Sequence, residues 1–154
     1  AMPLLAKGGK FVYGWSVISP ERKVIIPPQI IQEYKLPENG KIILMSSSKV
    51  SGGFSITTKA MLKQSKLNVI VNDNPELAEY SLPEGMTIKY KGRKYCWVTM
   101  ENKIIRLPKQ TMEAYDVKVN DKLLSIRSSN IAFTLIVKGP IIAVANQHPE
   151  LEEF

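Results

Sequence analysis

Side chains suited to catalysis or metal binding are few in this 154-residue chain. It contains one cysteine, Cys96, and one histidine, His148, whereas a structural zinc site needs about four ligands of these types. Cys96 lies in the apolar alternation Tyr95-Cys96-Trp97-Val98, which predicts a small buried side chain rather than a nucleophile. His148 lies in the acidic tail HPELEEF, where we expect solvent around it. These residue types predict no metal site.

The usual sequence patterns of an enzyme active site are also missing. The carboxylates are scattered, no glycine-rich phosphate loop is present, and no nucleophile elbow is found. We therefore expect no catalytic residues and no cofactor.

The net charge of +7 is distributed unevenly along the chain. Residues 1–75 hold nine Lys and one Arg against three Glu and one Asp, which gives +6, and residues 76–154 carry the remaining +1. Lysine and arginine attract phosphates at long range, so a concentration of them suits a surface that binds a polyanion. The charge pattern favours the first half as the place of such a surface.

One stretch of the chain occurs twice in altered form. Residues 23–41, KVIIPPQIIQEYKLPENGK, are similar to residues 105–122, IRLPKQTMEAYDVKVNDK. Aligning Pro27 with Pro108 places Tyr34 on Tyr115 without a gap, and it also aligns Lys41 with Lys122. Self-similarity of this length indicates a repeated structural unit.

Each copy predicts a strand, a short helix and a second strand. In the first copy the β-branched run Val24–Ile26 ends at a proline, which holds the preceding residue extended and is tolerated at the first helical position. The apolar residues that follow are spaced for one face of a helix, and they end at Tyr34 and Tyr115 in the two copies. We expect both tyrosines to be largely buried anchors. Turns at Asn39-Gly40 and Asn120-Asp121 then lead into the next strands.

Two tryptophans precede the repeated stretches at similar distances. Trp15 and Trp97 each lie in a segment with the alternating, aromatic and β-branched content of a strand. Stacking on single-stranded nucleic acid is one possible role for them. Packing in the core is the expected role, because both belong to alternating strands.

The middle of the chain, residues 68–93, has no counterpart in the repeat. Its Asn68–Val71 run predicts a strand, and a hairpin is expected around Lys91-Gly92-Arg93. Outside this segment, Ala60–Leu67 and Pro140–Gln147 are compatible with either helix or strand, so both alternatives stay open.

The repeated unit resembles the AbrB-like, or SpoVT-AbrB, swapped-hairpin domains of prokaryotic transcription regulators and antitoxins. The family pattern is a basic residue, a β-branched run ending in proline, a short helix, and a turn of the Leu-x-x-Gly-Asp-Lys-Val type. Lys23–Pro27 and Leu36–Ile42 are similar to its two parts in the first copy. Pro108-Lys109 and Asp121–Leu123 carry the same marks in the second copy.

The resemblance implies a mainly β fold with short helices, in which two internal repeats form one swapped-hairpin β-barrel as a pseudo-dimer. The expected organisation is a first AbrB-like copy at residues 10–67, a structured connector at 68–93 and a second AbrB-like copy at 94–147. A unit of this size needs a partner, because an isolated hairpin is marginally stable in water. The copies either interleave within one chain or pair with their equivalents in a homodimer.

Binding of duplex DNA is the function that the resemblance implies, through basic residues on the first strand and in the turn before the β-branched run. The residues at these places are Lys10, Arg22 and Lys23 in the first copy and Lys103 and Arg106 in the second. Lysine and arginine neutralise phosphates, and arginine also reads guanine edges. The predicted function is that of a non-catalytic, DNA-binding transcriptional regulator.

Departures from the family pattern favour an alternative function. Family helices often carry basic residues after the proline, where this chain has Ile31 and Gln32 in the first copy and Met112 and Glu113 in the second. Ile104 also occupies the place of the basic residue in the second copy, so this copy is expected to contact nucleic acid less. The alternative is a ligand-sensing or assembly β-barrel that does not bind nucleic acid.

Features of a membrane or exported protein are missing from the sequence. No apolar run approaches the roughly 20 residues of a membrane helix, and no charged-then-apolar signal segment opens the sequence. We expect a cytoplasmic location and no membrane partner.

Overall fold

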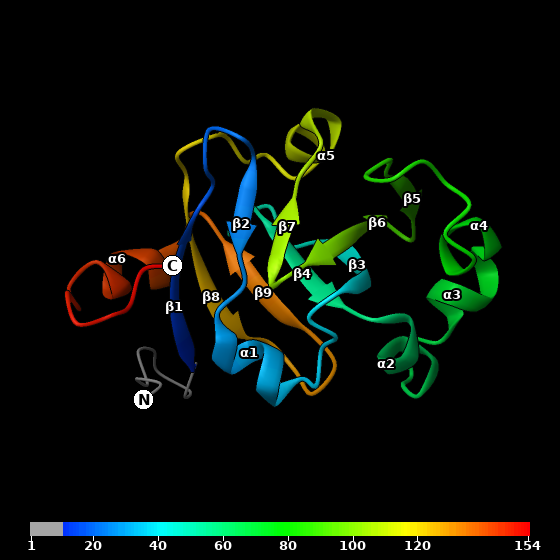
Figure 1. Ribbon diagram of the computed structural model, residues 1–154, viewed down its shortest axis with the longest axis horizontal. Coiled ribbons are helices and arrows are strands. Elements are labelled where there is room, and N and C mark those ends of the chain that lie inside the picture. Colours follow the sequence, from blue (N-terminus) through cyan, green and yellow to red (C-terminus); the bar gives the residue numbers. More distant parts are fainter. Residues whose placement is uncertain (1–10) are drawn as a thin grey trace.

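The computed structural model describes residues 11–154, and Lys10, one of the residues predicted to contact DNA, lies outside them. Residues 11–154 form a mainly β fold in which nine strands belong to one antiparallel sheet, accompanied by six short helices (Figure 1). The strands are β1 (Val12–Val17), β2 (Lys23–Ile25), β3 (Gly40–Ser46), β4 (Phe54–Thr57), β5 (Ile88–Tyr90), β6 (Arg93–Glu101), β7 (Ile104–Arg106), β8 (Lys122–Arg127) and β9 (Phe133–Ile136). The helices are α1 (Pro28–Glu33), α2 (Lys59–Lys63), α3 (Val69–Asp73), α4 (Pro75–Ala78), α5 (Lys109–Ala114) and α6 (Pro140–Ala145).

The sheet curls into a nearly closed barrel. Its strand order is β1-β8-β9-β4-β3-β6-β7-β2, and β5 pairs with β6 off this path. The two end strands, β1 and β2, are consecutive in the chain, and the Ser16 hydroxyl donates a hydrogen bond to the Ile25 carbonyl at 2.6 Å across the gap between them. The remaining edge of β1 is covered by the C-terminal segment, since the amide of Trp15 donates to the Glu152 carbonyl at 2.8 Å. Closure of this kind leaves few backbone groups unpaired at sheet edges.

Apolar side chains from every strand of the path fill the barrel. Phe54 and Phe133 are the largest fully buried side chains, and they lie among aliphatic residues of the strands and of α1 and α5. Each buried side chain of this size stabilises the fold by roughly 1.5–3 kcal/mol relative to an exposed one. The barrel interior is therefore the main source of stability.

Two smaller apolar clusters lie on the outside of the sheet, on opposite sides of it (Figure 1). On one side, α2, α3 and α4 pack on the outward residues Ile43 and Met45 of β3. On the other side, α6 packs on Leu124 and Ile136 of β8 and β9. The outer faces of β4 and β9 lie between these two covers.

The strand, helix and strand predicted for each copy are confirmed. β2, α1 and β3 occupy the first copy, and β7, α5 and β8 occupy the second. Pro27 and Pro108 stand directly before the helical residues at extended ψ angles of 132° and 153°, so each proline separates a strand from a helix. Tyr115 is buried as predicted, whereas Tyr34 is only partly buried.

The prediction of a strand at Asn68–Val71 is wrong, because the segment enters α3. β-branched residues favour strands, but here Ile70 and Val71 gain burial against Leu62 and Leu77 of the neighbouring helices. Tertiary packing thus overrides local preference. The two ambiguous segments also contain helices, α2 and α6.

Four of the strand pairings connect the two halves of the chain. β1 pairs with β8, β3 with β6, β2 with β7, and β4 with β9. Each pairing joins a strand within residues 10–67 to a strand of the second half, where β6 begins at Arg93, one residue before the predicted start of the second copy. The halves consequently share one sheet.

Candidate nucleic-acid interface

Strands β2 and β7 form a short ribbon with basic side chains on its outer face. Their register places Lys23 directly opposite Arg106, and both residues are exposed. The next pair, Val24 and Ile105, has no exposed surface and faces the core. Since side chains alternate across a strand, the lysine and the arginine project together into solvent.

Arg22 lies beside this pair and is held by the backbone of Leu107, the residue that follows β7. Its Nε atom donates to the Leu107 carbonyl at 3.0 Å, and its own carbonyl accepts from the Leu107 amide at 2.9 Å. The backbone of Arg22 is left-handed, with φ of 64°, because it closes the turn between β1 and β2. One edge of the guanidinium is therefore anchored, and its remaining donors stay available to an anion.

Arg22, Lys23 and Arg106 line one depression of about 720 Å³. Two carboxylates, Glu84 and Glu101, also line it. None of the three cations lies within 4.0 Å of a carboxylate of residues 11–154, so their charges are not neutralised by ion pairs there. Like charges directly opposite each other in a sheet are destabilising, which makes an anionic partner favourable at Lys23 and Arg106.

Lys103 does not line this depression, although its neighbours Asn102 and Ile104 do. It lies in the turn between β6 and β7, with φ of 67°, and its carbonyl accepts from the Ile26 amide at 2.9 Å. Its Nζ atom is 3.9 Å from a carboxylate oxygen of Glu38. Three of the predicted residues thus line one depression, Lys103 does not line it and lies near Glu38, and Lys10 is outside the described residues.

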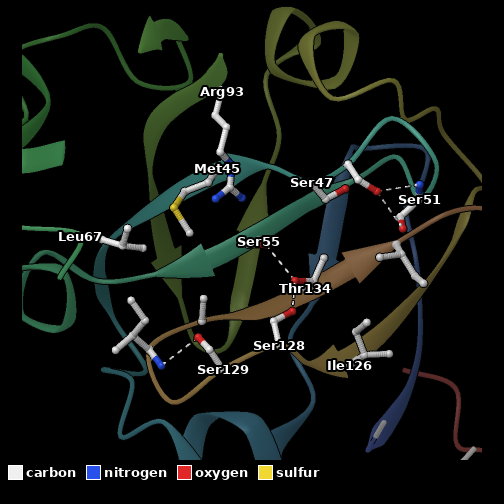
Figure 2. Close-up of a pocket in the computed structure, with 14 residues that line it drawn as sticks. Met45, Ser47, Ser51, Ser55, Leu67, Arg93, Ile126, Ser128, Ser129 and Thr134 are labelled. Carbon is white, nitrogen blue, oxygen red and sulfur yellow. Dashed lines mark hydrogen bonds between the residues drawn. The ribbon is translucent and has the colours of Figure 1, made fainter. Parts of the chain in front are cut away.

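A second depression, of about 320 Å³, lies over the outer face of β4 and β9 (Figure 2). The hydroxyls of Ser55 and Thr134 share a hydrogen bond of 2.8 Å across these strands, and Thr134 is also hydrogen-bonded to Ser128. Met45 and Ile126 border the depression on either side. Its lining offers hydroxyl groups for a small polar ligand. No prediction covered these hydroxyls, because only the pairing of β4 with β9 brings Ser55 and Thr134 together.

A polar cluster at the end of α1 links the helix to β1 and β8. The Arg127 guanidinium lies 2.5 Å from the Glu33 carboxylate, and the Tyr13 hydroxyl donates to the same carboxylate. Burial alone would raise the pKa of Glu33, but the hydrogen bonds from Tyr13 and Arg127 outweigh it and lower that pKa. Nearby in sequence, the Tyr34 hydroxyl donates to the Ser129 carbonyl at 2.7 Å, in the loop after β8. All charges of the cluster are matched, which indicates a structural role.

Cys96 is fully buried, as predicted. Burial raises the pKa of its thiol to about 11, so the thiol is protonated at neutral pH. Within residues 11–154, no group of three or more His, Cys, Asp or Glu residues is arranged to hold a metal ion. None of the helices in this part of the chain is long and apolar enough to cross a membrane.

Comparison of the chain with protein-family models, with curated proteins and with solved structures gave no match.

Proposed function

We propose that this protein is a two-copy swapped-hairpin barrel of the AbrB-like type that binds duplex DNA through the β2 and β7 ribbon. The pairing pattern supports the two-copy arrangement. In this arrangement, β6, β7, β8 and β9 of the second copy are equivalent to β1, β2, β3 and β4 of the first. Exchanging the copies therefore turns the pairing of β1 with β8 into the pairing of β6 with β3, and both pairings are present. The pairings of β2 with β7 and of β4 with β9 each join a strand to its own equivalent.

Aromatic contacts repeat in the same way. Lys41 Nζ lies 5.1 Å from the centre of the Trp97 ring, and Lys122 Nζ lies 4.6 Å from the centre of the Trp15 ring. Lys41 and Lys122 are equivalent in the ungapped alignment, and both tryptophans come from the strand that opens a copy. A matching pair of cation–π contacts supports an approximate two-fold relation between the copies.

The observation that carries the DNA proposal is the Lys23 and Arg106 pair. An antiparallel two-stranded ribbon fits the major groove of duplex DNA, and this pair lies on the exposed face of such a ribbon at the junction of the two copies. Arg22 adds a third cation next to it. We assign phosphate contact to Lys23, and contact with phosphate or guanine edges to the two arginines.

Fluorescence anisotropy with a labelled duplex at low salt tests this proposal. The variant Arg22→Glu/Lys23→Glu should bind at least about tenfold more weakly than the unmodified protein. The slope of log affinity against log salt should become shallower by roughly 0.9 for each phosphate that the variant no longer neutralises. Lys63→Glu/Lys66→Glu is the matched control, because it makes the same charge change at exposed positions outside the depression.

The outcome also decides between the proposal and a ligand-sensing barrel. The hydroxyl-lined depression over the outer face of β4 and β9 favours that second candidate. No binding of duplex by the unmodified protein at low salt would reject the DNA function in its favour. Equal losses of affinity in the test and control variants would show that only net charge matters, and would reject the assigned interface.

A further inference from the structure

Four lysines from three separate segments converge on a third depression, of about 550 Å³, beside the end of α5. Lys49 comes from the loop between β3 and β4, Lys89 and Lys94 come from the β5 and β6 hairpin, and Lys138 follows β9. None of them belongs to the proposed DNA ribbon, and the two depressions share no lining residue.

Positive charge dominates this depression. Asp116 is the one carboxylate that lines it, and its Oδ2 atom lies 3.6 Å from Lys138 Nζ. Lys49, Lys89 and Lys94 form no ion pair within 4.0 Å with a carboxylate of residues 11–154. The four lysines and one aspartate leave a charge of +3 in a concave space.

Two of the lysines oppose each other directly. The register of β5 and β6 pairs Lys89 with Lys94 across the hairpin. Like charges at directly opposite positions destabilise a sheet, and here no carboxylate relieves the repulsion. An anion between the two ammonium groups would remove this cost, so the arrangement favours the bound state of an anion site.

The loop that carries Lys49 is held by hydrogen bonds to the two residues that follow β9. The Ser51 carbonyl accepts hydrogen bonds from the amides of Val137 at 3.1 Å and Lys138 at 3.0 Å. Gly53, with φ of 75°, lets the loop approach so closely that a Cβ atom there would lie 2.0 Å from the Leu135 carbonyl oxygen. Lys49 and Lys138 therefore lie on neighbouring backbone segments that are hydrogen-bonded to each other. Binding a ligand should require little further ordering of this backbone.

We propose that this depression binds a ligand bearing at least two phosphate groups. Three lysines without carboxylate partners match the charge of a pyrophosphate group, and ammonium groups are compact donors suited to phosphate oxygens. The phosphates belong either to a free phosphorylated small molecule or to the backbone of a nucleic acid strand. This site is independent of the DNA ribbon, and the proposal does not rest on the proposed function.

Isothermal titration calorimetry with inorganic pyrophosphate tests the site directly. The unmodified protein should give saturable binding to one site, and pyrophosphate should raise its melting temperature. Lys89→Gln/Lys94→Gln should bind about tenfold more weakly or worse, because each charge-assisted hydrogen bond contributes substantially to affinity. Lys63→Gln/Lys66→Gln removes the same charge outside the depression and should bind as tightly as the unmodified protein.

Anisotropy with a labelled duplex, run on the same variants, distinguishes the two sources of phosphate. Saturable pyrophosphate binding that is weakened about tenfold or more only in Lys89→Gln/Lys94→Gln supports a free phosphorylated ligand. Duplex binding that this variant weakens, while Lys63→Gln/Lys66→Gln does not, supports binding of a nucleic acid backbone. The proposed site would be rejected if millimolar pyrophosphate did not bind and the duplex affinity did not change. It would also be rejected if both variants changed binding equally. Far-UV circular dichroism of both variants verifies that the exposed substitutions leave the fold intact.

Discussion

The Tyr115 hydroxyl and the Cys96 Sγ atom lie 3.4 Å apart and share a hydrogen bond inside the barrel. Tyr115 directly follows α5, and Cys96 lies in β6, so the contact attaches the end of this helix to the sheet. Both side chains are buried, and the ring of Tyr115 also packs on Phe54 with centroids 5.5 Å apart. The reactivity of the Cys96 thiol and the contribution of Tyr115 to stability therefore depend on the same packing.

The first prediction concerns the reactivity of Cys96. Because burial raises its pKa from 9.0 to about 11, we expect no reaction with Ellman's reagent at pH 8 in the native protein and rapid reaction in denaturant. The raised pKa stabilises the folded state below pH 9, and this contribution should disappear as the pH rises from about 9 toward 11. Fast labelling of the native protein at pH 8 would contradict the buried thiol.

The second prediction compares the equivalent tyrosines. Tyr115→Ala should lower the free energy of unfolding by about 3–5 kcal/mol, because it removes a buried aromatic side chain. Tyr34→Ala should cost less, since this side chain is only partly buried, although its ring packs on Phe133. Urea denaturation measures both values. Equal losses of stability would mean that the two helices are anchored alike despite their different exposure.

A third prediction separates the two basic residues of the second copy. Arg106→Glu should weaken duplex binding about tenfold or more, because Arg106 faces solvent opposite Lys23. Lys103→Glu should weaken it less, because Lys103 does not line the depression and lies beside Glu38. Anisotropy at two salt concentrations measures the difference. Neither change should alter the unfolding midpoint much, as exposed charges contribute little to folding. A larger effect of Lys103→Glu would contradict the assigned face.

The fourth prediction compares two glycines with similar positive φ angles, Gly53 and Gly92. Gly92 has φ of 82° and open space where a Cβ atom would lie, so Gly92→Ala should cost only about 1–2 kcal/mol of left-handed strain. Gly53→Ala should cost about 1–3 kcal/mol more, because its Cβ atom would overlap the Leu135 carbonyl. Thermal denaturation compares them. Similar costs would show that the loop between β3 and β4 moves freely away from β9.

Local structure was the part of the fold that the sequence predicted well. Pro27 and Pro108 restrict the backbone on both sides, and the apolar spacing after them suits a helix in any context, so β2, α1, β7 and α5 were predictable. α3 was not, because the burial that makes Val71 helical comes from α2 and α4. The same applies to Tyr34, whose exposure depends on where Phe133 lies.

The candidate sites depended on long-range register, which the sequence does not encode locally. Arg22 and Lys23 were predictable as basic residues of a turn, but their meeting with Arg106 requires β2 to pair with β7 in one register. The depression lined by four lysines could not be predicted from the sequence for the same reason. Lys49, Lys94 and Lys138 are far apart in the chain, and only the assembled sheet brings them together.

The exchange of strands between the halves has a consequence for biosynthesis. β1 and β3 emerge first from a ribosome, whereas their partners β8 and β6 lie about 110 and 50 residues later. At roughly 5–20 residues per second, the first half spends several seconds with exposed strand edges before its partners exist. Such edges are templates for aggregation. The nascent chain should therefore depend on chaperones most strongly before β8 and β9 are made, and slower synthesis should lengthen this exposure.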